Sequence, residues 1–507
     1  MIEYQLYIAG EWRRGSSTMP AVSPSSGETF ASVATADEHI AGEAVEAAAA
    51  AWPGWAALSA FERADLMQAA AASIRQHRDD LARVLTEDQG KPLVAEAYDE
   101  VDELVEYFRM AAADAVRQEG SLPHSVSPER RVLVRRVPLG VVAIVSPWNW
   151  PYTMGAELFA PALAAGNTVV WVPAPTTSAC CAALMQVLAE GAGLPAGVFN
   201  FVPGPGPVVG AAVVSHPLVN GVGFIGSTAT GAEVARHAAG KAQILELGGN
   251  GPMVILQDAD LELATAATLE AAYLCAGQSC TAGERFLVHR AVHAEFVERV
   301  VEATRASVTL GDPFDASTTM GPLNNEPTAA KFDRHVADAR DRGATICTGG
   351  RRAPDFRTGL FAEPTVLDGV TIEMLIAAEE TFGPVVPVIE IGSAAEALEL
   401  TNSAPLGDGG SPFGLTAAVF TADLERGLAF ADQARAGWVN INASTNLWES
   451  HLPFGGRSGS LSGRGRVGGR SVLEAFTESH TVLYPAPGLR EPGRREPVLR
   501  DDAQDHE

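Results

Sequence analysis

The chain has 507 residues, of which 47% are hydrophobic and 19% are charged, a composition typical of a globular protein and too apolar for a disordered one. Its 62 acidic and 36 basic residues give a net charge of −26. Because so acidic a surface repels nucleic-acid backbones and anionic lipid headgroups, we expect neither a nucleic-acid partner nor a membrane partner. At roughly 100–200 residues per domain, the length predicts two or three domains.

The cysteines and the first residues indicate a cellular compartment. The five cysteines are odd in number and lack the spacing of a zinc site or of a disulfide framework, so we expect no metal. Residues 1–4 have neither the basic start nor the apolar stretch of a secretory signal. The longest apolar runs, such as residues 137–145, are shorter than the roughly 20 residues that span a bilayer. We therefore expect a cytoplasmic protein.

The first 140 residues predict a strand, a long helical region and a second strand. Residues 4–8 alternate in polarity and end at a glycine turn. Residues 38–115 are rich in alanine, with apolar positions every three or four residues, and we expect breaks at Pro53-Gly54 and at residues 90–92. Residues 131–137 alternate again, as a half-exposed strand does.

Two series of short β-branched runs follow, and helix-like segments separate them. The first series comprises residues 141–145, 168–172, 197–202 and 221–225, and the second comprises residues 253–256, 285–288, 365–370, 385–389, 417–420 and 439–441. Strands that alternate with helices predict βαβ units and parallel sheets. The fold class is therefore α/β, with two doubly wound parallel-sheet domains that meet at a glycine-rich hinge near residues 248–252.

Cys280 is a candidate nucleophile because small and polar residues surround it in Gly-Gln-Ser-Cys-Thr-Ala-Gly (277–283). A structural cysteine usually lies among large apolar residues, whereas this setting lets another molecule approach the thiol. An inert buried thiol is the alternative. Cys275 lies in a more apolar segment and is expected in the core, and the pair Cys180-Cys181 is expected to pack within a helix.

Glu246 is a candidate general base because it lies between two leucines and precedes Gly248-Gly249. The leucines indicate burial, which raises the pKa of a carboxyl group toward neutrality, and the glycines let a backbone or a ligand come close. A glutamate that points into solvent from a strand is an equally good interpretation.

Two further segments follow strands of the first series. Asn149 lies in Pro-Trp-Asn-Trp-Pro (147–151), at the end of a strand where open α/β sheets bind ligands, and its amide could donate to an oxyanion. A simpler interpretation is that the tryptophans of this loop only pack as rigid structural side chains. Residues 221–226 match GxGxxG, but the glycines lie within the strand, so we favour a helix that begins near residue 227, with Ser or Thr as its N-cap and its amides facing a pyrophosphate.

These fragments occur in one fixed order, and together they resemble the NAD(P)-dependent aldehyde dehydrogenase superfamily of the non-phosphorylating, hydrolytic type. The resemblance extends from about residue 6 to about residue 483. It is carried by PWNWP (147–151), LAAGNTVVW (163–171), GFIGSTATG (223–231), LELGGN (245–250), GQSCTAG (277–283), EETFGPV (379–385) and PFGG (453–456).

The resemblance implies a role for each matching residue. Cys280 would attack the aldehyde as a thiolate, Asn149 and the Cys280 amide would hold the oxyanion, and Glu246 would activate the water that hydrolyses the thioester. Glu380 would hold the nicotinamide ribose and Phe382 would position the ring. The implied cofactor site comprises Trp148, Val172, Gly223, Gly226, Ser227, Gly248, Glu380 and Phe382.

The chain departs from the family pattern where the adenine ribose binds. Family members usually carry a lysine after the tryptophan of the GNTVVW-like strand, and NAD users often have a glutamate three residues later. Here these positions are Val172 and Pro175. Because the neighbouring loop 204–210 holds no arginine for a 2′-phosphate, we expect NAD⁺ rather than NADP⁺.

The resemblance also implies domain boundaries. The cofactor domain would comprise residues 1–125 and 141–248, with residues 448–470 returning to it, and the catalytic domain residues 249–447. Residues 126–140 and 471–487 would form a β arm that joins subunits into a homodimer or homotetramer, and residues 488–507 an exposed tail.

The substrate would be a small-molecule aldehyde whose identity the sequence does not give. We expect the substrate funnel to be lined by Trp150, Tyr152, Met154, Glu157, Ser279, Thr281, Leu447 and Trp448, an aromatic and apolar set that favours an uncharged aldehyde over a dicarboxylic semialdehyde. His451 and Arg457, nearby in sequence, could reverse that preference.

Two alternative functions remain. A CoA-acylating semialdehyde dehydrogenase would have no need of Glu246 as a hydrolytic base. A catalytically silent binding or structural homologue is suggested by Val172 and Pro175 and opposed by the joint presence of Cys280, Glu246 and Asn149.

Overall fold

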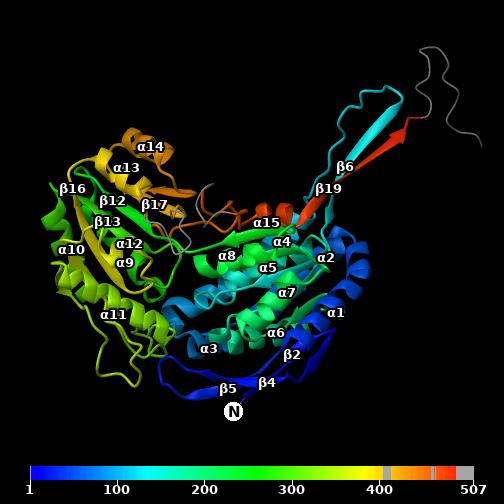
Figure 1. Ribbon diagram of the computed structural model, residues 1–507, viewed down its shortest axis with the longest axis horizontal. Coiled ribbons are helices and arrows are strands. Elements are labelled where there is room, and N and C mark those ends of the chain that lie inside the picture. Colours follow the sequence, from blue (N-terminus) through cyan, green and yellow to red (C-terminus); the bar gives the residue numbers. More distant parts are fainter. Residues whose placement is uncertain (1, 404–412, 458–461, 463, 487–507) are drawn as a thin grey trace, which may run out of the picture.

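The computed structural model describes residues 2–403, 413–457, 462 and 464–486. It consists of two α/β units, each built on a seven-stranded sheet, and a two-stranded ribbon that projects from them (Figure 1). The expected α/β fold with two mainly parallel sheets is confirmed. The expected tail at residues 488–507 lies outside the described residues.

The first sheet has the strand order β11-β10-β7-β8-β9-β2-β3. Its five parallel strands are β7 (Val141–Val145), β8 (Thr168–Val172), β9 (Phe199–Phe201), β10 (Val219–Ile225) and β11 (Ala242–Glu246). The antiparallel strands β2 (Leu6–Ile8) and β3 (Glu11–Arg13) extend it at one edge. The two faces of the sheet contact separate apolar cores, which is why its strands are almost continuously apolar.

The helices of this unit include the crossovers of its parallel strands. They are α1 (Glu38–Ala57), α2 (Ala60–Gln76), α3 (Arg78–Gln89), α4 (Tyr98–Ala115), α5 (Thr153–Ala164), α6 (Ser178–Gly191), α7 (Ala211–Ser215) and α8 (Thr228–His237). All residues of α5 are buried, because it packs against both α4 and the sheet. The expected break at Pro53 is wrong, since α1 continues to Ala57, whereas the break after Gln89 is confirmed by the left-handed Gly90.

The second sheet has the order β14-β15-β16-β13-β12-β17-β18. Its strands are β12 (Gly251–Ile255), β13 (Gly283–His289), β14 (Thr345–Thr348), β15 (Thr365–Asp368), β16 (Val385–Ile391), β17 (Thr416–Phe420) and β18 (Trp438–Ile441), of which β14 is antiparallel. The helices of this unit are α9 (Leu261–Tyr273), α10 (His293–Ser307), α11 (Glu326–Asp341), α12 (Leu375–Ala378), α13 (Ala394–Asn402) and α14 (Leu424–Gln433).

Two smaller sheets complete the described chain. Strands β1 (Ile2–Tyr4), β5 (Thr29–Thr35) and β4 (Ser17–Val22) form one of them, so the single strand expected at residues 4–8 is divided between two sheets. Strands β6 (Arg130–Pro138) and β19 (Thr477–Pro485) form the antiparallel ribbon, and the short helix α15 (Arg470–Ala475) precedes β19 and packs on α4 and α5. In the part of the chain that the structure describes, no helix combines the length and the apolar character needed to cross a bilayer.

Candidate active site

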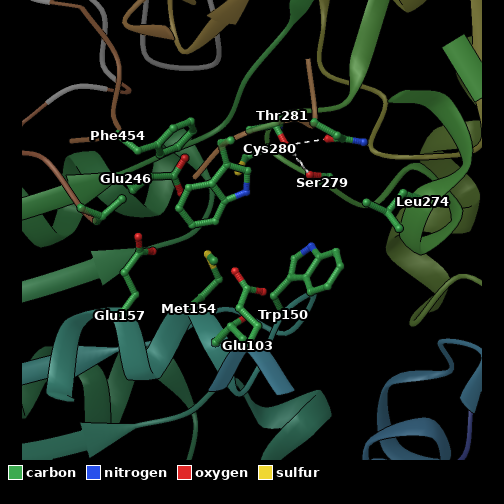
Figure 2. A pocket seen from close by; sticks show the side chains of 14 residues that line it. Glu103, Trp150, Met154, Glu157, Glu246, Leu274, Ser279, Cys280, Thr281 and Phe454 are labelled. Carbon is green, nitrogen blue, oxygen red and sulfur yellow. Dashed lines mark hydrogen bonds between the residues drawn. The ribbon is translucent and has the colours of Figure 1, made fainter. Parts of the chain in front are cut away.

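A pocket where the two units meet brings together the central residues of the sequence analysis (Figure 2). One wall comes from α4, α5 and the loop after β7, and the opposite wall from the end of β11 and the loop before β13. The lining residues are Glu103, Trp150, Thr153, Met154, Glu157, Glu246, Leu274, Ser279, Cys280, Thr281, Asn446, Trp448, Phe454 and Val467.

Cys280 reaches this pocket from a tightly constrained loop after α9. Cys275 and Ala276 have φ angles of 52° and 54°, in the left-handed region that non-glycine residues rarely adopt. The Cys275 amide donates to Glu96 Oε1 at 3.0 Å, and this bond holds the turn. A Cβ atom on Gly277 would lie 2.2 Å from the Gly383 carbonyl oxygen, so the close packing of this loop requires glycine. The loop therefore fixes the position of Cys280, a half-buried residue that lines the pocket.

Glu246 ends strand β11 and lies beside Cys280 on the same wall of the pocket (Figure 2). Its side chain is buried, with 3% of the residue exposed. Burial raises the pKa of the Glu246 carboxyl to about 8, although a hydrogen bond with Cys280 opposes the rise. Burial, followed by the negative charge of Glu246, raises the pKa of the Cys280 thiol well above its usual range. The resting pair is therefore a neutral thiol beside a carboxyl group that titrates near physiological pH.

Gly248 and Gly249 bring two parts of the site into contact, as their small size indicated. A Cβ atom on Gly249 would lie 2.0 Å from the Cys280 carbonyl oxygen, and one on Gly248 would lie 2.8 Å from Glu380 Oε2. The Gly249 amide also donates to Glu380 Oε1 at 2.8 Å. The two glycines thus connect the loop of the thiol to the carboxylate of Glu380.

Asn149 follows β7, and its amide points toward the loop that carries Cys280. Asn149 Nδ2 donates to the Gln278 carbonyl at 2.9 Å, and the residue is 6% exposed. Since an amide nitrogen carries two N–H groups, this bond fixes the side chain and uses one of them. The other N–H can donate to a further acceptor.

Trp148 and Phe382 form an edge-to-face pair beside Glu380, with ring centroids 5.4 Å apart. Phe382 has a φ angle of 59°, and Glu284 stabilises this strained backbone. The two carboxylate oxygens of Glu284 accept from the Thr381 and Phe382 amides, both at 2.9 Å. Glu284 was not predicted from the sequence, because it lies in a strand and only the fold brings it to this loop.

A second pocket lies at the carboxyl ends of β7 and β10 and beside α8. Its lining residues are Val145, Gly206, Pro207, Gly210, Ala211, Val214, Phe224, Ala229, Thr230, Glu233, Val234 and His237. Ser227 is the N-cap of α8, as predicted, and its hydroxyl accepts from the Thr230 amide at 3.3 Å. Gly226, half-buried, immediately precedes this cap.

Two residues expected at the cofactor site lie inside the protein core instead. Gly223 is buried in β10, where an added Cβ atom would lie 2.9 Å from Ile144 and 3.0 Å from Leu158. Alternation along the strand points Phe224 toward the second pocket and Gly223 away from it. Val172 is 1% exposed and packs in the core beneath the sheet. Pro175 is exposed at the start of a short 3₁₀ turn.

Most of the residues expected to line the substrate funnel do line the first pocket: Trp150, Met154, Glu157, Ser279, Thr281 and Trp448. Tyr152 does not, since it is fully buried and its hydroxyl donates to the Leu81 carbonyl at 3.1 Å. Leu447 is half exposed and does not line the pocket either. His451 pairs with Glu449 at the surface, and Arg457 donates to the Ala434 carbonyl, so neither supplies a cation to the pocket.

Glu103, on α4, lines the pocket and was missed by the sequence analysis. It lies in a helix with no recognisable motif, more than forty residues before the first motif. Phe454 lies in the PFGG segment, whose pattern alone was compatible with an ordinary loop. Cys275, Cys180 and Cys181 are buried in the core, as predicted.

Comparison with known proteins identifies the family. Residues 12–482 match the aldehyde dehydrogenase family. The chain is 36% identical over 483 residues to the human mitochondrial succinate-semialdehyde dehydrogenase, covering 94% of this chain and 88% of the relative. It is also 36% identical over 483 residues to the glutarate-semialdehyde dehydrogenase of Pseudomonas aeruginosa, and this match covers 94% of this chain and 97% of the relative.

Comparison with solved structures indicates the same family. A Staphylococcus aureus betaine aldehyde dehydrogenase in complex with NAD⁺ has a TM-score of 0.90 at 33% identity, covering 95% of this chain and 94% of that chain. The resemblance predicted from the ordered motifs is thus confirmed. The chain belongs to the aldehyde dehydrogenase family, and it is an enzyme that oxidises an aldehyde to the carboxylic acid with a nicotinamide cofactor.

Proposed function

We propose that Cys280 is the nucleophile of this oxidation and that Glu246 is the base that completes it. The observation that carries the proposal is that these two groups, from different units of the fold, lie side by side in one pocket. A thiol elsewhere in the chain would lack either a base or access to a substrate: Cys180, Cys181 and Cys275 are buried, and Cys347 lies on β14 in the second unit.

In the first half of the reaction the Cys280 sulfur bonds to the aldehyde carbon while its proton passes to the carboxylate of Glu246. Asn149 Nδ2 and the Cys280 amide stabilise the oxyanion of the resulting thiohemiacetal. When bound, the nicotinamide supplies the acceptor for the hydride that leaves this carbon, and a thioester remains on Cys280.

In the second half Glu246, which has released the thiol proton to solvent, removes a proton from a water molecule that attacks the thioester carbon. The carbon–sulfur bond breaks, the carboxylic acid leaves and Cys280 regains its proton. A buried carboxyl whose pKa is about 8 suits both halves, because it accepts and releases a proton near neutral pH.

The residues at the second pocket fit a dinucleotide. The N-terminus of the ten-residue helix α8 lies beside the pocket, and its free amides and dipole favour a pyrophosphate. We infer that Ser227 and Gly226 contact the pyrophosphate, while Glu380, Phe382 and Trp148 hold the nicotinamide end near Cys280. Gly248 contributes because its lack of a side chain leaves room for the Glu380 carboxylate.

We propose NAD⁺ rather than NADP⁺ as the cofactor. Among the described residues, neither lysine nor arginine lines the second pocket, whose ionisable lining residues are His237 and Glu233, the latter paired with Arg236 of the same helix. A carboxylate beside the adenosine would repel a 2′-phosphate. Steady-state kinetics with both cofactors test this: kcat/KM should be at least about tenfold higher with NAD⁺. An equal or higher value with NADP⁺ would overturn the preference.

We further propose the division into a cofactor domain (1–125, 141–248 and 448–470), a catalytic domain (249–447) and a β arm (126–140 and 471–487). The separate sheets support the first two, and the ribbon of β6 and β19 supports the arm. The arm would join a homodimer or homotetramer. Five free thiols and an absence of disulfides in the described chain suit a reducing compartment, and we propose the cytoplasm.

The proposed function is tested by measuring the formation of reduced nicotinamide after the purified protein is mixed with NAD⁺ and a panel of simple aldehydes. Cys280→Ala should remove turnover with every aldehyde. Cys347→Ala, which deletes a partly exposed thiol on β14, should retain it. Wild-type turnover in Cys280→Ala would exclude Cys280 as the nucleophile.

A further inference from the structure

The substrate pocket contains more carboxyl groups than the proposed chemistry uses. Glu246 serves as the base, but Glu103 and Glu157 also line the pocket. Figure 2 shows their carboxylates rising from α4 and α5 toward the wall that carries Cys280 and Glu246. Neither residue has a part in the formation or hydrolysis of a thioester.

Glu157 is the more unusual of the two. It is the one charged residue of α5, a helix whose residues are all buried, and it is itself 2% exposed. Within the described part of the chain, neither of its carboxylate oxygens forms a hydrogen bond. A buried carboxyl without a partner is unfavourable, so it is expected where a ligand supplies the partner.

The remaining charges near the pocket do not compensate Glu157. Among the described residues, no lysine, arginine or histidine lines this pocket. Lys91 lies 3.5 Å from the ring centroid of Trp150, but it pairs with Glu100 at 2.5 Å and does not reach the lining. The charges of Glu103 and Glu246 add to burial in raising the pKa of the Glu157 carboxyl well above its usual range.

Apart from the polar groups of Thr153, Ser279, Cys280, Thr281 and Asn446, the other side chains of the pocket are aromatic or apolar. Trp150, Trp448 and Phe454 contribute ring surface, and Met154 and Leu274 contribute apolar surface. Carboxylates beside tryptophan rings make a good environment for an organic cation, since the ring faces and the carboxylates both attract positive charge. The same environment repels the carboxylate of a dicarboxylic semialdehyde.

We propose that this pocket selects aldehydes that carry a positively charged, ammonium-type group at the end away from the carbonyl, with Glu157 and Glu103 as its anionic partners and Trp448 as its aromatic contact. The proposal rests on the proposed function, because Cys280 must take the aldehyde end. It separates this chain from the relatives named for succinate and glutarate semialdehydes, whose substrates end in a carboxylate.

Three aldehydes of similar length test the proposal. They are 4-(trimethylammonio)butanal, its uncharged isostere 5,5-dimethylhexanal, and succinic semialdehyde. We expect kcat/KM at pH 8 to be at least about tenfold higher for the cation than for the isostere, and lowest for the anion. Equal or higher kcat/KM for the isostere or the anion would overturn the proposal.

Glu157→Gln tests the assignment to this residue. The ratio of kcat/KM for the cation to that for the isostere should fall toward one, because Gln keeps the shape and removes the charge. If this variant does not fold, Glu103→Gln should lower the same ratio. Glu106→Gln is the matched control, since it removes an exposed charge of α4 outside the pocket, and its ratio should equal that of the wild type. An unchanged ratio in the folded pocket variants would overturn the assignment.

The outcomes distinguish this inference from the proposed function. If the isostere and the anion are oxidised through Cys280 without preference for the cation, only the present inference fails. If none of the three aldehydes, nor any of the simple panel, yields reduced nicotinamide, the proposed function fails with it.

Discussion

The carboxyl group of Glu246 and the thiol of Cys280 lie together in a buried environment, which favours the protonated form of both. In the proposed mechanism, attack on an aldehyde requires the pair to lose one proton, and hydrolysis of the thioester requires Glu246 to be ionised. The rate of each half of the reaction therefore depends on the pKa of Glu246.

This dependence gives a pH prediction. The pKa of Glu246 is raised from its usual range to about 8, so its ionised form is scarce below pH 8 and dominant above it. We expect kcat to rise about tenfold per pH unit between pH 6 and pH 8 and to level off above that. Steady-state rates at saturating aldehyde and NAD⁺ between pH 6 and pH 10 measure it. A flat profile across pH 6–8 would contradict the assignment of Glu246 as the base.

Single residues were predictable where their neighbours are unusual. Cys280 among small residues and Glu246 between leucines and glycines could be singled out from sequence. Tyr152 could not be separated from pocket residues, because nothing in its segment shows which side of the loop faces the core. Glu103 carries no local signal, and only the packing of α4 against α5 brings it to the pocket.

At the scale of elements, the loop that follows α12 depends on Glu284 in strand β13. Its carboxylate binds the amides of Thr381 and Phe382, and Phe382 keeps a left-handed φ angle of 59° that costs about 1–2 kcal/mol. Loss of these bonds would let the backbone relax and move Phe382 away from Trp148.

We therefore predict that Glu284→Ala raises the KM for NAD⁺ by about tenfold, the equivalent of 1.4 kcal/mol, with a smaller effect on the KM for the aldehyde. Steady-state kinetics with each substrate varied in turn measure the two constants. Glu390→Ala, an exposed change in the neighbouring strand β16, is the control and should leave both constants near the wild-type values. A similar rise in both constants for Glu284→Ala would indicate general damage rather than loss of this loop.

The parallel strands were the most predictable elements, because burial on both faces makes them continuous β-branched runs such as residues 141–145 and 168–172. Of the antiparallel strands, those at residues 4–8 and 131–137 were predicted from alternation, but β4, β5 and β14 were not. Strands β4, β5 and β14 contain exposed and half-buried positions, and their pairing depends on partners supplied by the fold.

At the scale of the whole molecule, the ribbon of β6 and β19 pairs with no other strand of the described chain, apart from an isolated bridge at Ser121. It exposes large apolar side chains, including Leu483 at 53% and Tyr484 at 44%. A two-stranded ribbon alone is only marginally stable in water, so we expect a second copy of the chain to cover it.

This expectation predicts a mass of at least twice 53.0 kDa for the purified protein by size-exclusion chromatography with light scattering. Leu483→Glu should shift the protein toward the monomer, because it places a charge in the proposed interface. Leu218→Glu makes the same change at an exposed loop before β10 and should leave the mass unaltered. A monomeric wild-type protein would rule out the proposed arm.

We propose that Cys280 and Glu246 act one after the other within one pocket. Rapid mixing of the Glu246→Gln variant with NAD⁺ and an aldehyde at pH 9 tests this proposal most directly. Gln cannot activate water, whereas hydroxide at this pH can still ionise the thiol. We predict a burst of reduced nicotinamide of about one equivalent per active site, followed by a steady rate at least about a hundredfold below that of the wild type. A steady rate equal to that of the wild type would contradict the account.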